Sequence, residues 1–152
     1  MKDTRKEKKE GQGIRTILSQ EIMYNVKFLT EVRDNIRSEE AKYKTTYKPD
    51  GQGGSTSEGN PIKVLASYHF SVLSQRAWEV HMQLLSSALS VKEIETAFLF
   101  YSNLNSAVAA QAKFHQSLDS PKDPATYLPL AYQRLTDVIK RIEATVQSYP
   151  KL

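Results

Sequence analysis

Apolar residues recur every three or four positions along four separate stretches of this chain, and this spacing restricts the fold more than any other feature. It places the apolar side chains on one face of an α-helix. The first stretch runs from Ile14 to about Glu40, and Asn25 interrupts its apolar series. We therefore expect a long amphipathic helix with one amide on its core face. Its apolar positions are Ile14, Leu18, Ile22, Leu29, Val32 and Ile36.

The second stretch begins after Asn60 and Pro61, a pair typical of a helix start. The Asn side chain accepts a backbone hydrogen bond there, and the first turn of a helix does not use the donor that Pro lacks. The alternating four-three spacing is of the coiled-coil type and predicts one continuous helix to about Ser86. Trp78 and Leu85 widen its apolar face. The positions of this face are Ala66, Phe70, Leu73, Ala77, Val80 and Leu84.

A third helix is predicted by an unusually complete start signal. Ser90 and Glu93 are spaced as a capping box, and Leu89 and Ile94 occupy the two flanking staple positions. We expect this helix to end near Leu118. Its predicted apolar face is Ile94, Phe98, Tyr101, Asn105, Val108, Ala112 and His115.

A fourth helix is expected after Asp123 and Pro124, which repeat the combination of a cap residue followed by proline. Tyr149 and Pro150 close it. Pro129 conflicts with this scheme: either the helix starts later and Pro129 lies in its first turn, or Pro129 separates a short turn from the main helix. The predicted apolar face is Leu128, Ala131, Leu135, Val138, Ile142 and Val146.

Four amphipathic helices without any period-two segment predict an all-α protein, a four-helix bundle with a long flexible loop between helices 1 and 2. A chain of 152 residues is long enough for one core. We expect a charged flexible tail over residues 1–12 and a single bundle domain over 13–149. Residues 42–60 contain four glycines, Pro49 and several hydroxyl residues with almost nothing apolar after Tyr47, and a disordered loop is expected there.

Composition excludes several classes of function. The chain has no cysteine, which rules out disulfides and thiolate chemistry, and its net charge of +4 is too small and too dispersed for a nucleic-acid binder. No apolar run is long enough to span a bilayer, and no signal peptide is visible. His69, His81 and His115 lack the Glu-x-x-His spacing of di-iron bundles. We therefore predict no catalytic residue, no metal and no cofactor.

Polar residues on the apolar faces are the candidates for a functional site. Asn25 and Asn105 occupy core-type positions, where a buried amide needs hydrogen-bond partners. They either fix the register of the helices, as polar core residues do in coiled coils, or line a ligand pocket together with Tyr101 and His81. Trp78 either covers a flank of the bundle or anchors a protein partner.

The pattern of these residues resembles the soluble helical part of small, uncharacterised prokaryotic proteins that carry one or two membrane helices. In that group a Glu-Ile-x-x-Asn-x-x-x-Leu pattern opens a helix, and a Trp-containing segment leads into a capped helix with Tyr and Asn. The resemblance implies no activity. The membrane helix of that group is not in the residues given, so either Met1 is a natural start or the sequence begins after a membrane span. The matching residues here are Glu21, Ile22, Asn25, Leu29, Trp78, Ser90 through Tyr101, Leu104 and Asn105.

The sequence therefore favours a non-enzymatic helical bundle that acts through a protein partner or through homo-oligomers, next to a membrane if an upstream segment anchors it. The first alternative is a ligand-sensing bundle with a polar pocket near Asn25 and Asn105. The second is an enzyme without a recognisable motif. As given, the chain is expected to be soluble, either cytoplasmic or the soluble part of a longer membrane-anchored parent.

Overall fold

The computed structural model describes residues 4–46, 60–119 and 124–152, and none of these residues lies in a strand. The all-α prediction is confirmed. Three long helices are joined by a chain of short helical pieces. In order, the elements are α1 (Thr4–Thr46), α2 (Pro61–Ser67), the 3-10 helix η1 (Phe70–Val72), α3 (Arg76–His81), the 3-10 helix η2 (Met82–Leu84), α4 (Leu85–Ala88), α5 (Val91–Leu118) and α6 (Pro124–Gln147).

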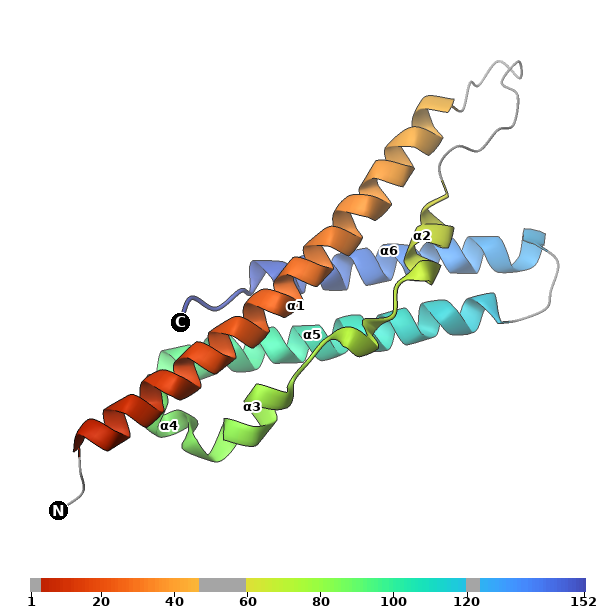
Figure 1. The fold of residues 1–152 in the computed structure, drawn as a ribbon. Coiled ribbons are helices and arrows are strands. Elements are labelled where there is room, and N and C mark those ends of the chain that lie inside the picture. The colour runs from red at the N-terminus through yellow and green to blue at the C-terminus, as the bar shows by residue number, and fades with distance from the viewer. Residues whose placement is uncertain (1–3, 47–59, 120–123) are drawn as a thin grey trace.

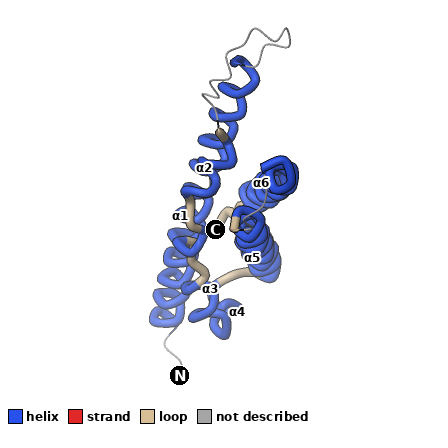
Figure 2. Tube along the Cα trace, turned by 90° about the vertical axis from the view of Figure 1, so that its right-hand side faces the viewer, coloured by secondary structure: helices blue, strands red, loops and turns tan. Residues whose placement is uncertain are grey.

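The helices form two layers around one hydrophobic core. The helices α5 and α6 pack side by side in opposite directions and make up one layer (Figure 1). The helix α1 and the short pieces from α2 to α4 make up the other layer, as the turned view shows (Figure 2). Figure 1 also shows that α1 crosses the α5–α6 pair at an angle, so its C-terminal turns project beyond that pair.

The apolar face of α1 is buried as predicted, and Asn25 lies fully buried within it. The helix is longer than expected at both ends. The predicted tail is wrong for residues 4–12, which are helical, and the predicted loop is wrong for 42–46, which also belong to α1. Residues 1–3 and 47–59, on which the remainder of these two predictions falls, lie outside the described part of the chain.

The prediction of a continuous second helix is wrong. The chain leaves helical geometry at Tyr68, where ψ is 140°, and again at Leu73, where ψ is also 140°. Phe70 is buried as expected, but Val80 is 65% exposed and Leu84 is 55% exposed. The alternation of apolar residues in this segment therefore does not form one core face. After the breaks a different side of the segment faces the core, so that Ala77 and Trp78 are buried while Val80 and Leu84 are exposed.

The helix α5 begins where its capping signal predicts. The Ser90 hydroxyl accepts a hydrogen bond from the Glu93 backbone, and the Glu93 carboxylate accepts one from the Ser90 backbone. The predicted apolar face, however, is correct only in part: Tyr101 is buried as predicted, but Phe98 and Asn105 are exposed, because the core faces a stripe displaced by one residue. The buried stripe lies next to the predicted one and contains one polar residue, Gln111, whereas the predicted stripe contains Asn105 and His115. The positions of the buried stripe are Ala97, Phe100, Leu104, Ala107, Gln111 and Phe114.

The helix α6 buries most of its predicted face, with Leu128 exposed at one end and Thr145 buried in place of Val146 at the other. Neither alternative for Pro129 is correct, since it lies inside a helix that already starts at Pro124. The predicted cap residue Asp123 lies outside the described residues.

Candidate functional site

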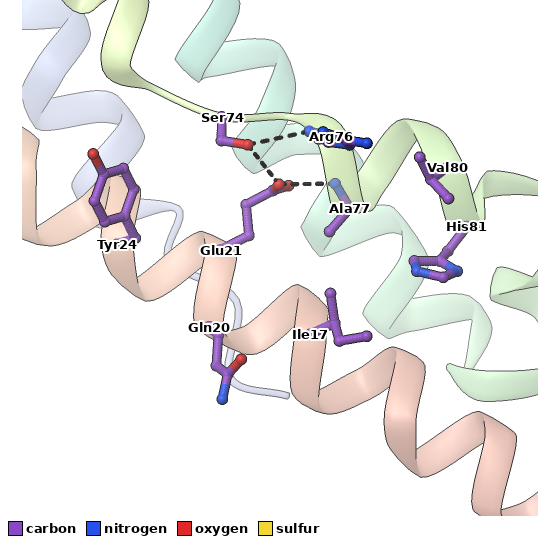
Figure 3. Close-up of a pocket in the computed structure, with 9 residues that line it drawn as sticks. All are labelled: Ile17, Gln20, Glu21, Tyr24, Ser74, Arg76, Ala77, Val80 and His81. Carbon is purple, nitrogen blue, oxygen red and sulfur yellow. Dashed lines mark hydrogen bonds between the residues drawn. The ribbon is translucent and has the colours of Figure 1, made fainter.

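The carboxylate of Glu21 joins α1 to two other parts of the chain, of which Figure 3 shows the bonds to Ser74 and Ala77. Its Oε1 accepts a hydrogen bond of 2.6 Å from the Tyr101 hydroxyl on α5 and one of 3.4 Å from the Trp78 backbone N–H. Its Oε2 accepts bonds from the Ala77 backbone N–H at 2.8 Å and from the Ser74 hydroxyl at 2.9 Å. Ala77 and Trp78 lie in the first turn of α3, whose N–H groups have no partner within the helix. Glu21 therefore caps α3 from a distant part of the sequence.

Asn25 lies one turn further along α1 and holds the break that precedes α3. Its Nδ2 donates to the Ser74 carbonyl at 2.7 Å, and its Oδ1 accepts from the Ser74 backbone N–H at 2.9 Å. A break in a helix leaves such backbone groups without intrahelical partners, and their burial without partners is costly. We call Glu21, Asn25, Ser74 and Tyr101 the Glu21 junction. Its bonds explain why the sequence folds into short pieces here in place of one helix.

The Tyr101 hydroxyl stays protonated at the junction. Burial raises its pKa well above the ordinary value, and the hydrogen bond to Glu21 and the charge of that carboxylate raise the pKa further. A protonated hydroxyl donates to the Glu21 carboxylate, whereas a tyrosinate would repel it. Tyr101 therefore acts as a permanent donor that orients Glu21.

Trp78 is part of the core at the same place. Its side chain is only 6% exposed and stacks on the Tyr101 ring at a centroid distance of 4.9 Å. The Trp78 ring also lies next to the Phe98 ring, at a centroid distance of 6.5 Å. The hypothesis that Trp78 is an exposed anchor for a partner is therefore wrong. Its burial agrees with the other interpretation, in which Trp78 covers a flank of the bundle.

An open groove lies between α1 and α3 in front of the junction (Figure 3). Its volume is about 530 Å³. The apolar side chains along it are well exposed, Ile17 by 44% and Tyr24 by 51%, and Val80 more so. The residues that line the groove are Ile17, Gln20, Glu21, Tyr24, Ser74, Arg76, Ala77, Val80 and His81.

The four residues predicted to share a ligand pocket are only partly brought together. Asn25 and Tyr101 are linked through Ser74 and Glu21, and His81 lies half-buried along the groove. Asn105 is exposed, which corrects its predicted core position, and it accepts a hydrogen bond from the Gln75 side chain. It borders a separate hollow of about 150 Å³ beside Trp78. No single polar pocket near Asn25 and Asn105 is present among the described residues.

Glu21 itself was not predicted to act at a site. In the sequence it stands out only as the first residue of the pattern that carries the resemblance. The available signal was its position one helical turn before a core Asn, which places both polar groups on neighbouring parts of one face. Because Glu21 lies at the edge of the apolar stripe, periodicity alone predicts a solvated carboxylate there.

The polar groups of the site are satisfied within the chain. Across the described ranges, no buried side-chain nitrogen or oxygen lacks a hydrogen-bond partner. The same part of the chain contains no group of three or more histidine and acidic side chains placed to hold a metal ion. None of the described helices combines the length and the apolar character needed to cross a membrane.

Comparison with known proteins gives no relative. The chain matches no known protein family, and no curated protein or solved structure is significantly similar to it.

Proposed function

We propose that this protein is not an enzyme and acts through protein–protein contacts or self-association, with the groove between α1 and α3 as the contact surface. The observation that carries the proposal is the exposure of Ile17, Tyr24 and Val80 around one groove, in front of polar groups that are already satisfied. Exposed apolar side chains gathered at one place are typical of interaction sites.

The chemistry of the groove favours binding over catalysis. Glu21 is the carboxylate that lines it, and this carboxylate accepts four hydrogen bonds from the chain itself. A general base needs a free position toward the proton that it abstracts. Glu21 is committed to holding α3, so we assign it a structural role.

The shape of the groove favours a protein partner. A small-molecule site typically encloses about 70–90% of its ligand. Here the apolar walls are themselves half exposed, so a compact ligand would remain largely in water. A helix or loop of another chain covers such a surface more fully.

The proposal has two further parts. In its architecture, the protein is a four-helix bundle in which the short pieces of residues 61–88 take the place of the second helix. In its setting, the resemblance to membrane-anchored proteins supports a position next to a membrane. If the chain belongs to a longer protein, flotation of that protein with membranes, before and after removal of its upstream segment, tests the position next to a membrane.

Charge introduced into the groove tests the proposal. Ile17→Glu and Val80→Glu place a carboxylate on either wall, and Leu130→Glu on α6 is a control that changes an equally exposed apolar side chain elsewhere. In quantitative affinity purification and in cross-linking of the pure protein, we expect both groove variants to lose the contacts that the control retains. Contacts that survive in both groove variants would exclude this surface.

A ligand-sensing function is the second candidate, because the groove volume lies within the range of about 300–1,000 Å³ found for small-molecule sites. Two results together would favour this second function. The wild type would make no protein contacts in the purification and cross-linking experiments, and a small molecule would raise the melting temperature of the wild type but not that of Val80→Glu.

A further inference from the structure

We propose that the partner of the α3 surface is a second copy of this chain, related by a two-fold axis, with the two α3 helices packed antiparallel. The inference rests on the proposed function and gives its contact surface a defined occupant. The structural feature behind it is the pairing of one positive and one negative side chain on the open face of a short helix.

The open face of α3 carries Arg76, Glu79 and Val80, all of which are exposed. Spacings of three and four residues place these side chains on the same side of a helix. Ala77 and Trp78 face the opposite way and are buried. The face therefore combines one apolar side chain with two opposite charges about one helical turn apart.

Neither charge is used within the described chain. The guanidinium of Arg76 and the carboxylate of Glu79 form no ion pair with any residue in the ranges that the structure describes. A uniformly acidic partner would attract Arg76 but repel Glu79, and a uniformly basic partner would do the reverse. A surface that carries both signs is matched by a surface with the same two signs in reverse order.

A second copy provides that reverse order. Across a two-fold axis the same patch appears on both partners, so each residue i that meets j is accompanied by j meeting i. If the axis passes between Ala77 and Trp78, Arg76 of each copy lies opposite Glu79 of the other, giving two ion pairs. Val80 of each copy then lies opposite Gln75 of the other, near the end of the groove that Ser74 and Tyr24 line.

The size of the surface sets the expected strength. A stable interface buries roughly 800 Å² on each partner. The six residues of α3, even with Ile17 and Tyr24 beside them, offer a smaller patch. We therefore expect a reversible dimer whose population depends on concentration and falls with added salt.

Charge reversal gives a direct test by analytical ultracentrifugation over a wide range of protein concentration. Arg76→Glu alone and Glu79→Arg alone each create two like-charge contacts across the axis, so each should raise the dimer Kd by about tenfold or more. The double variant restores both pairs and should dimerise like the wild type. An equimolar mixture of the two single variants should form a heterodimer, because each then meets its opposite charge.

Matched controls change the same charges on another helix. Lys92→Glu and Glu95→Arg on α5 are exposed positions and should leave the Kd of the dimer unchanged. Circular dichroism of every variant shows whether it remains folded. The mixture of the two single variants keeps the test valid if one of them is less stable, because formation of the heterodimer is a gain of association that an unfolded variant would not show.

The outcomes separate this inference from the function on which it rests. A wild type that stays monomeric over the whole range, a double variant as weak as the single variants, or single variants that dimerise normally would each overturn the α3 contact. If Ile17→Glu and Val80→Glu still abolish contacts with another protein in that case, the proposed function stands with a different partner. If they abolish nothing, both proposals fail.

Discussion

Glu21 is the residue at which α1, α3 and α5 meet. Its carboxylate accepts hydrogen bonds from two backbone N–H groups and two hydroxyls. Hydrogen bonds to a charged group contribute more than neutral ones, roughly 1.5–3 kcal/mol each. Asn25 adds two bonds to the same break in the chain. Two polar side chains on one helix thus determine the path of a distant segment.

A double-mutant cycle measures the strongest bond of the junction. Glu21→Gln and Tyr101→Phe should each destabilise the protein, and their effects should be non-additive by roughly 1–3 kcal/mol because they remove the same charged hydrogen bond. Urea denaturation of the wild type, both single variants and the double variant gives the coupling free energy. Glu31→Gln, an exposed position on the same helix, is the control and should change stability little. A coupling near zero would contradict the assigned bond.

The raised pKa of Tyr101 has a consequence at alkaline pH. Above about pH 10, the pKa of an unperturbed tyrosine, the unfolded chain releases a proton that the folded chain retains, so stability falls as pH rises. The slope contributed by one such group is at most about 1.4 kcal/mol per pH unit. The free energy of unfolding should therefore fall less steeply above pH 10 in Tyr101→Phe than in the wild type. Phe98→Leu, on the same helix, removes an aromatic ring but no titratable group and should keep the wild-type slope.

At the level of elements, the start of α5 is held by contacts from three parts of the chain. Glu93 completes the capping box with Ser90 and also pairs with Arg15 of α1. Arg15 donates a further bond of 3.0 Å to the Ala88 carbonyl at the end of α4. The same arginine therefore links the end of one helix to the start of the next.

Removal of the cap gives a prediction for α5. Ser90→Ala leaves the Glu93 backbone N–H without its side-chain acceptor and should cost about 1 kcal/mol of stability. Ser86→Ala, an exposed position in α4, should stay within about 0.5 kcal/mol of the wild type. Thermal and urea denaturation of the two variants measure the difference. Equal effects would show that the cap contributes nothing specific.

The same contacts predict a response to acid. The hydrogen bond from Arg15, followed by the Ser90 backbone bond, lowers the pKa of Glu93 to about 2. This stabilisation is fully present above the ordinary pKa of glutamate, near 4.5, and is lost as pH falls toward 2. Because both side chains are partly exposed, it amounts to at most about 1 kcal/mol. Glu93→Gln should therefore show a smaller loss of stability between pH 4.5 and pH 2 than the wild type.

At the level of the whole molecule, the core covers only the middle of α1. Its buried positions extend from Ile14 to Ile36, whereas the side chains described from Arg5 to Glu10 are exposed. Amide exchange depends on the free energy of local opening. We expect amides between Ile14 and Ile36 to exchange more slowly than those of residues 5–10, as hydrogen exchange with mass spectrometry can measure. Uniform protection along the helix would contradict this map.

The sequence predicts those parts of the fold that are defined by a single apolar face or by a complete helix cap. The faces of α1 and α6 and the start of α5 are correct because a single apolar stripe or a complete capping box defines each of them. The face of α5 is wrong because two adjacent stripes of that helix are both largely apolar. Periodicity cannot choose between them without knowledge of the neighbouring helix.

The predictions of the second helix and of the site are wrong for the same reason. The segment from Ala66 to Leu84 has helical spacing throughout, but its two breaks are bonded by side chains from distant parts of the sequence. Asn25 of α1, 49 positions away, bonds the Ser74 backbone, and Gln111 of α5 donates to the Tyr68 carbonyl. Local pattern contains no information about such partners. The sequence offered a shared pocket of Asn25 and Tyr101 only as an alternative to a role in helix register, and it contains no sign of the Ser74 and Glu21 bonds that link the two residues once the helices are placed together.

The spacing of Glu21 and Asn25 has a mechanical consequence for α1. A shift of a helix by one residue moves each side chain about 1.5 Å along the axis and 100° around it. Such a step would carry both side chains away from Ser74 and α3 together. Piston-like travel or rotation of α1 therefore requires the release of α3, so a pull along this long helix would load the bonds to the short one.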